Sequence, residues 1–408
     1  MSYRNKLDRG LYTLGILFVY RLGSYVTIPG LDLSVLSEFY NSNSSILGVF
    51  NNISGGSVSR MSIMSLNLMP YVSASIIMQL LTAVIPEWRE LKKDTFQRKK
   101  INRYSRVLAL GIALIQAIGI LVGLERVPGL VLKQDIIFRF TTVISIVTAS
   151  LMVMWLAERI SERGIGNGSS VIIFTGIVCS SIPSAIALLI DYLTGSCESK
   201  IFYAGATFTL IFTSLIVFCE ATRYSVQILF KKSVLSSSQN LSVDISSSYI
   251  PIKINPSGVL SVMFADSMMI IPALIIRILD SFFRIKQDLV ISLILLLLKA
   301  ALIVFFSIFC LSFTMNPEDI SDNLRSRNAF VPSVNEGKRT AEFFEQVLNR
   351  IAVIGCVYMV FVAITPELLA VLFPELRRIT LSGTSLLILI GVALEIYSRM
   401  APEPKIKE

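Results

Sequence analysis

Ten long apolar runs, separated by polar segments, dominate the hydrophobic pattern of the chain. Each run approaches the roughly 20 apolar residues that an α-helix needs to cross the hydrocarbon layer of a bilayer. The runs lie near residues 10–29, 68–86, 104–125, 136–157, 169–190, 201–220, 257–280, 289–314, 348–366 and 382–399. The pattern predicts an all-α integral membrane protein with ten transmembrane helices.

A segment of mixed character precedes the second run. In ISGGSVSRMSIMSLNLMPY (Ile53–Tyr71) serines are interspersed with methionine, leucine and isoleucine. About a dozen residues between the glycine pair and Pro70 are too few to span a membrane. Polar backbone at membrane depth is tolerated only inside protein or beside a watery cavity. We interpret the segment as re-entrant; the alternative is an outer loop lying on the lipid headgroups.

The polar segments predict the orientation of the chain. Residues 87–103 carry seven Lys or Arg and three acids, whereas the segments on the opposite side are leaner in basic residues. Because cytoplasmic loops are enriched in Lys and Arg, both termini are expected in the cytoplasm. Two cytoplasmic segments, 221–256 and 315–347, are too long for simple turns. They are interpreted either as loops that meet a partner or as mobile connectors.

The order of the runs also predicts a division into halves. Residues 1–190 and 191–408 would each contain five spans. Since five is odd, the second half would enter the membrane from the opposite side, which is the topology of an inverted repeat.

Composition supports a membrane protein and argues against catalysis. Hydrophobic residues make up 53% of the chain and charged residues 16%, against about 25% charged in soluble proteins. The net charge of +9 is assigned to the cytoplasmic loops, so nucleic-acid sequence recognition is not expected. The chain has no histidine, the commonest general base and metal ligand. We therefore expect no enzyme activity, no metal and no cofactor.

Several ionisable residues fall inside the apolar runs, where charge is costly and often functional, and five of them are singled out here. They are Arg21, Arg139, Asp266, Lys299 and Glu395. Their spacing is unlike that of a proton relay. A separate glycine pattern in ERGIGNGSS, centred on Gly166, differs from the GxGxxG of nucleotide loops and follows no strand, so it predicts a tight turn.

Eight stretches, in order along nearly the whole chain, resemble the SecY family of channel subunits of the Sec protein translocase. They are RLGSYVTIPGLD (21–32), SGGSVSRMSI (54–63), MPYVSASIIMQLLTAVIP (69–86), QRKKINRYSRV (97–107), MWLAERISERGIGNGSSVIIFTGIV (154–178), KINPSGV (253–259), NPEDISDNLRSRNAFVPS (316–333) and LSGTSLLI (381–388).

The resemblance implies a ten-span bundle in two inverted five-helix halves, closed on the outer side by a short plug helix near residues 53–66. The plug residues it singles out are Ser54, Gly55, Gly56, Arg60 and Ile63. A constricting ring of aliphatic side chains would comprise Val72, Ile76, Ile173, Ile177, Met263 and Ile388. A lateral gate between spans two and three and spans seven and eight would include Gln79, Thr82 and Ser267.

The same resemblance implies a motor- or ribosome-contacting role for the two long cytoplasmic loops. The residues concerned are Arg223, Asn335, Lys338 and Arg339. Here the chain departs from the family pattern: Ala221 and Thr222 replace an Arg-Gly pair, and Asn335 stands where the family has arginine.

The implied function is a protein-conducting channel that passes unfolded polypeptides across the membrane and releases membrane segments into the bilayer. Expected partners are SecE-like and SecG-like small subunits, the SecA motor or a ribosome, and secretory and membrane polypeptides. The membrane would be the bacterial inner membrane or that of a bacterium-derived organelle. An inverted-repeat secondary transporter is the alternative, but only the first half shows an interrupted helix. A third reading is a scaffold or insertase subunit without a pore.

Overall fold

Long α-helices make up most of the described chain. The computed structural model describes residues 3–32, 56–57, 60–85, 88, 95–125, 129–133, 135–194, 199–234, 242–255, 258–269, 272, 289–327, 329–332, 334, 337–373 and 382–400. The chain forms two compact units. One is Met1–Phe202 together with Val392–Glu408, and the other is Tyr203–Gly391.

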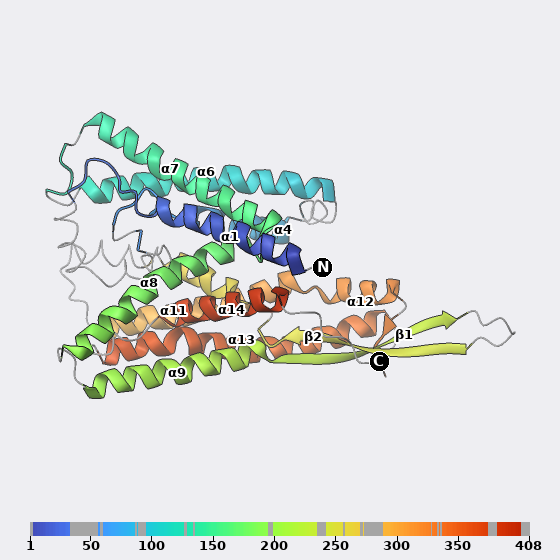
Figure 1. Ribbon diagram of the computed structural model, residues 1–408. Helices are drawn as coiled ribbons and strands as arrows, with labels where there is room; N and C mark the ends of the chain where they lie inside the picture. Colours follow the sequence, from blue (N-terminus) through green and yellow to red (C-terminus); the bar gives the residue numbers. More distant parts are fainter. Residues whose placement is uncertain are drawn as a thin grey trace. The chain divides into compact units, whose positions relative to one another are not determined.

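The first unit is built around two long helices, α6 and α7. Helix α6 packs on α7 and on α4, and α7 also packs on α1 and α8 (Figure 1). The bounds of these helices are α1 Tyr3–Gly23, α4 Met69–Val84, α6 Thr95–Glu125, α7 Ile136–Arg163 and α8 Gly168–Leu193.

The second unit combines membrane-length helices with a small sheet. Helix α13 packs on α11 and on α12. The elements are α9 Ser199–Ala221, which begins in the first unit, β1 Arg223–Val234, β2 Ser242–Lys253, α11 Leu289–Thr314, α12 Pro317–Ser326, β3 Ala329–Phe330, α13 Lys338–Leu372 and α14 Gly383–Met400, which ends in the first unit. A short apolar helix, Leu260–Met269, lies between β2 and α11.

The predicted membrane spans coincide with helices. Each of the ten apolar runs contains helix within the described residues. Among the residues that the structure describes, six helices are long and apolar enough to cross a membrane, and Met69–Thr82 and Leu260–Met269 are shorter apolar helices. The fold is therefore that of an all-α membrane protein, while the count of ten complete spans stays a prediction.

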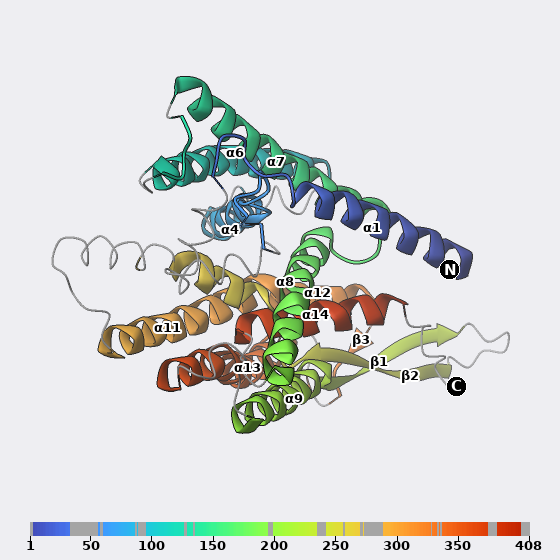
Figure 2. The ribbon, with the colours of Figure 1, turned by 60° about the vertical axis from the view of Figure 1, so that its left-hand side comes forward.

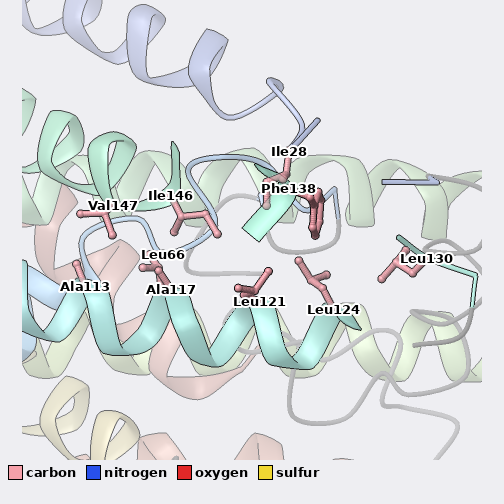
Figure 3. Close-up of a cluster of buried hydrophobic side chains, with 10 residues drawn as sticks. All are labelled: Ile28, Leu66, Ala113, Ala117, Leu121, Leu124, Leu130, Phe138, Ile146 and Val147. Atoms are coloured by element: carbon pink, nitrogen blue, oxygen red, sulfur yellow. The ribbon is translucent and has the colours of Figure 1, made fainter. Parts of the chain in front are cut away.

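A buried apolar cluster joins α6 to α7 (Figure 3). Ala113, Ala117, Leu121 and Leu124 follow one face of α6, at the spacing of three to four residues that a helix face requires. The figure shows this face turned toward Phe138, Ile146 and Val147 of α7 and toward Leu66. The alanines allow close approach of the helices. As a result, the chain just before α4 is fixed in the core of the first unit.

The polar segment 221–256 is not the loop expected from the sequence but a β-hairpin. Strands β1 and β2 pair antiparallel from Arg223–Lys253 to Val234–Ser242, and β3 joins the other edge of β1. The hairpin extends away from the ends of α9 and α13 in both views (Figure 1, Figure 2). Its base carries buried Val226, Ile228 and Ile252, which pack in one cluster with Phe344 and Leu348 of α13. The alternation Val226, Ile228, Phe230 was the overlooked strand signal.

The glycines between α7 and α8 form the predicted tight turn, and each is required for a different reason. A Cβ at Gly168 would lie 1.8 Å from the Ala157 carbonyl oxygen, and one at Gly164 would lie 2.6 Å from Thr13 Oγ1. Gly166 has a φ of +85°, which side chains disfavour. The Ile165 N–H donates to Thr13 Oγ1, so the turn is also fastened to α1.

Candidate functional site

The plug segment, defined here as residues 60–68, forms consecutive turns instead of the expected short helix. Met61 and Asn67 have positive φ values of 42° and 48°, which interrupt right-handed helix at both ends. Ser54 and Gly55, two of the predicted plug residues, lie outside the described residues. The described part of the plug is thus an irregular piece of chain that leads directly into α4.

Backbone hydrogen bonds attach the plug segment to the chain that follows α1. The Ile28 N–H donates to the Met61 carbonyl at 3.0 Å, and the Ile63 N–H donates to the Val26 carbonyl at 2.9 Å. Together they form an isolated antiparallel bridge centred on Thr27 and Ser62. A bridge of two hydrogen bonds stabilises far less than the full ladder between two strands of a sheet. This backbone attachment therefore fixes the position of the segment but contributes little free energy.

The Arg60 side chain adds a second attachment to the same place. Its guanidinium carbon lies 4.4 Å from the centroid of the Tyr25 ring, and that of Arg21 lies 4.7 Å from the same centroid. Arg21 also donates to the Tyr25 hydroxyl at 3.0 Å. Gly56, with a φ of +81°, leaves room for the guanidinium, because a Cβ there would lie 3.1 Å from Arg60 Nη2. Arg60 therefore anchors the plug segment through a cation–π contact.

Protein surrounds the polar side chains of the segment. Ser62, Ser65 and Asn67 are buried, and Ser62 Oγ accepts a hydrogen bond from the Met64 N–H at 3.0 Å. The Ser150 hydroxyl of α7 donates to the Asn67 carbonyl at 3.1 Å. A Cβ at Gly23 would lie 2.2 Å from Met64 Cε, so the absence of a side chain at Gly23 makes room for Met64.

Four of the predicted ring residues lie in the first unit as two buried pairs. Val72 and Ile76 are 7% and 4% exposed on α4, and Ile173 and Ile177 are 3% and 1% exposed on α8. Each pair is spaced by four residues and so shares one helix face. Helix α4 begins at Met69, with Pro70 in its first turn, so the first pair follows the plug segment almost immediately.

The other two ring residues belong to the second unit. Ile388 is buried on α14, and Met263 is half-buried on the helix Leu260–Met269. A Cβ at Gly383 would lie 1.9 Å from the Val362 carbonyl oxygen, so α14 approaches α13 at backbone distance one turn before Ile388. All six ring residues lie on helices; their meeting in one ring stays a prediction.

The predicted gate hydroxyls bond within their own helices. Thr82 donates to the Gln79 carbonyl at 2.9 Å, and Ser267 donates to the Met263 carbonyl at 2.8 Å. Gln79 accepts the hydrogen bond from Thr82 through its backbone carbonyl. The role of these three residues in a gate stays a prediction.

The ionisable residues noticed in the apolar runs all have polar or aromatic partners. Arg21 is bound to Tyr25, Arg139 pairs with Glu125 at 2.7 Å, and Glu395 pairs with Arg399 at 2.8 Å. Lys299 contacts both Asp266 and Glu367. Sequence reasoning missed Glu367 because it ended the ninth span at residue 366, whereas α13 continues to Leu372. The apolar LLAVLF that follows Glu367 was the available signal.

The predicted contact residues of the cytoplasmic loops lie at the ends of elements. Arg223 is exposed at the first position of β1, and Lys338 and Arg339 are exposed at the start of α13. Asn335 lies outside the described residues. Two contacts stabilise α12 within the loop 315–347. The Asn316 side chain caps the first turn by accepting a hydrogen bond from the Glu318 N–H, and the Ser321 hydroxyl donates to the Gly337 carbonyl.

Comparisons with known proteins match these features to one family. The model of the SecY family matches residues 62–397. The chain is 36% identical to "Protein translocase subunit SecY" of Rickettsia bellii, over 98% of the chain and 94% of that protein. It is 37% identical to the protein of the same description from Escherichia coli K12, over 96% and 90%.

Solved structures share the fold at low sequence identity. "The structure of a protein conducting channel" aligns with a TM-score of 0.67 at 15% identity, covering 96% of this chain and 91% of that one. "Sec61 in the Canine ribosome-channel complex from the endoplasmic reticulum" aligns with a TM-score of 0.63 at 15% identity and the same coverage.

Proposed function

This chain belongs to the SecY family, and from that premise we propose how its residues make a protein-conducting channel. It is a channel subunit of a Sec protein translocase and a multi-pass protein of the bacterial inner membrane. The finer assignment is that unfolded polypeptides cross between its two inverted halves, residues 1–190 and 191–408, and that membrane segments leave sideways into the bilayer.

The plug segment carries this proposal. It is buried, with Leu66 in the apolar cluster between α6 and α7, and its polar attachments include a two-bond backbone bridge, a cation–π contact and single hydrogen bonds. Such contacts are individually worth about 0.5–2 kcal/mol. A segment held in this way closes the resting channel and is displaced when a polypeptide enters.

The aliphatic ring supplies the second seal. Val72, Ile76, Ile173, Ile177, Met263 and Ile388 offer side chains without a polar group that could hold water or ions. A narrow apolar constriction excludes water by dewetting and so blocks ions. Aliphatic side chains also yield around a passing chain whatever its sequence, which suits a channel with many substrates.

We assign the lateral exit to four helices, which are α4, α6, the gate helix (Leu260–Met269) and α11. Gln79, Thr82 and Ser267 line it. Because the hydroxyls of Thr82 and Ser267 donate within their own helices, an apolar signal helix enters the exit without breaking those bonds.

Arg223, Lys338 and Arg339, with the hairpin, form the cytoplasmic docking surface. The exposed basic side chains suit an acidic motor or ribosomal RNA backbone, and a related fold occurs in a ribosome–channel complex. SecE-like and SecG-like subunits complete the channel. Both termini face the cytoplasm, or the matrix or stroma if the host membrane is that of an organelle.

Planar-bilayer conductance of the complex with its SecE-like subunit tests the plug. Deletion of residues 51–65 is expected to raise the resting ion conductance severalfold, because the ring alone then closes the pore. Deletion of residues 235–240, between β1 and β2, is the control and is expected to leave resting conductance unchanged. If the plug deletion inserts correctly and translocates a model preprotein while its resting conductance equals that of the parent, the plug assignment is wrong.

A further inference from the structure

A buried cluster of three charges joins three helices of the second unit. Lys299 of α11 lies with Nζ 2.9 Å from Asp266 Oδ1 and 2.5 Å from Glu367 Oε1. The side chains of Lys299, Asp266 and Glu367 are 7%, 11% and 27% exposed. Asp266 belongs to the gate helix and Glu367 to α13. One ammonium group thus serves two carboxylates from two different helices.

The charge balance distinguishes this cluster from a simple ion pair. An ammonium group has three donors and can serve both acids, but one positive charge cannot neutralise two negative ones. The two carboxylates also repel each other in surroundings of low dielectric constant. If the gate helix moves and takes Asp266 with it, Lys299 keeps Glu367 and the remaining pair is neutral. Glu367 therefore lowers the cost of separating Asp266 from Lys299.

Specific side-chain contacts join the gate helix to α11, which itself packs on α13. Helices α11 and α13 pack extensively on each other. The gate helix meets α11 through the Lys299–Asp266 pair and through an edge-on contact of Phe264 with Phe306, whose centroids are 5.7 Å apart. The paired charges and one aromatic contact thus connect the gate helix to α11.

The chain before the gate helix has a fixed point and a turn. The Asn255 amide donates to Glu220 Oε1 of α9 at 3.0 Å, and its carbonyl oxygen accepts from the Gly258 N–H at 3.1 Å. Gly258 has a φ of +61°, and a Cβ added there would meet open space. The gate helix is therefore preceded by an anchor at Asn255 and a glycine turn at Gly258, and it is joined to α11 at Asp266.

We propose that Lys299, shared between Asp266 and Glu367, is a releasable ionic latch on the gate helix. Asp266 closes the latch, and Glu367 is the counter-ion that takes over when Asp266 leaves. The latch sets how strongly a signal helix must compete to open the exit. This inference rests on the proposed function, because it assigns the helix Leu260–Met269 to the lateral exit.

Two isosteric substitutions test the latch, and each leaves a neutral ion pair behind. Asp266→Asn leaves Lys299 with Glu367, so the exit opens more easily. Glu367→Gln leaves Lys299 with Asp266, and opening then exposes an unpaired ammonium group, so the exit opens less easily. A purely structural cluster would respond to both substitutions in the same direction. The opposite signs identify a latch.

The assay uses the complex with its SecE-like subunit in vesicles, with its motor and a model preprotein. Two preproteins are compared, one with the full-length signal sequence and one whose signal sequence has a shortened apolar region. The measured quantity is the amount of the second preprotein translocated divided by the amount of the first. Asp266→Asn is expected to raise this ratio about fivefold and Glu367→Gln to lower it about fivefold. Glu395→Gln, which removes a carboxylate paired with Arg399 on α14, is the matched control and should leave the ratio unchanged.

The latch is overturned if Asp266→Asn and Glu367→Gln shift the ratio in the same direction or leave it unchanged. If Glu367→Gln fails to accumulate, Glu367→Asp is used and should lower the ratio less; failure of that variant too shows a structural role and overturns the latch. Absence of translocation by the parent complex would instead contradict the proposed function itself.

Discussion

The plug segment and the β1–β2 hairpin are both non-helical parts of a helical membrane protein, yet they are held in different ways. Residues 60–68 attach through an isolated two-bond bridge and one cation–π contact. The hairpin pairs over twelve positions, and its base packs on α12 and α13 in an apolar cluster that includes the fully buried Phe344. Both also reach a buried apolar cluster, the plug segment through Leu66 and the hairpin through its base, but of the two only the hairpin has a continuous ladder of backbone hydrogen bonds.

The difference fits the roles proposed for the two regions, a plug that is displaced and a hairpin on which a partner docks. Contacts of about 1 kcal/mol each are broken by an incoming substrate without unfolding the protein. A buried aromatic side chain is worth several kcal/mol, so a partner that pushes on the hairpin moves it as a rigid body. Damage to the hairpin should therefore affect stability and coupling, whereas damage to the plug contacts should affect the resting seal.

The largest effect is expected at the base of the hairpin. Phe344→Ala should destabilise the cytoplasmic region by about 3–5 kcal/mol, since it leaves a cavity beside Val226 and Ile228. Limited proteolysis should then cut within residues 235–253 much faster than in the parent. Tyr249→Ala, at an exposed position of β2, is the control, and the protease should cleave this variant at the parental rate. A parental rate for Phe344→Ala would mean that the cluster does not support the hairpin.

An intermediate effect is expected at the plug anchor. Tyr25→Leu removes the ring that faces the guanidinium groups of Arg21 and Arg60, a loss of about 1–2 kcal/mol. Resting ion conductance should rise severalfold while proteolysis of the hairpin stays unchanged. Tyr397→Leu, an exposed tyrosine on α14, serves as the matched substitution. An equal rise with Tyr397→Leu would show that the increase has nothing to do with Arg60.

The smallest effect is expected where α7 meets the end of the plug segment. Ser150→Ala removes the hydroxyl that donates to the Asn67 carbonyl, about 1 kcal/mol. Resting conductance should rise by a factor of about two, less than with Tyr25→Leu. Ser214→Ala, whose hydroxyl donates within α9 to the Leu210 carbonyl, provides the comparison. A rise larger than that of Tyr25→Leu would reverse the proposed order of plug contacts.

Hydrophobic pattern predicts the helices well because a bilayer demands long, uniformly apolar runs. It also marked residues 53–71 as unlike an ordinary span, since serines and glycines beside a span are informative. It did not show that the segment is a series of turns, because the positive φ of Met61 and Asn67 arises from contacts with residues more than thirty positions away. The hairpin was missed for a similar reason: Val226 and Ile228 are buried by α13, more than a hundred residues later.

The charged residues show the same limit. Asp266 and Lys299 were recognisable because charge in an apolar run is rare. Their shared partner Glu367 was not, because a boundary error of one residue placed it in a loop. Pairing between helices depends on which faces meet, and one sequence does not contain that information.

The glycine turn between α7 and α8 has a mechanical consequence. Gly168 sits at backbone distance from Ala157, so it fixes the angle at which α8 leaves α7. Ile177 lies nine residues further along α8, about 13 Å at 1.5 Å per residue. A change of about 10° at the turn would therefore displace Ile177 by about 2 Å, roughly half the width of a methyl group. The angle of the turn between α7 and α8 therefore determines where Ile177 lies, and with it the width of the proposed ring.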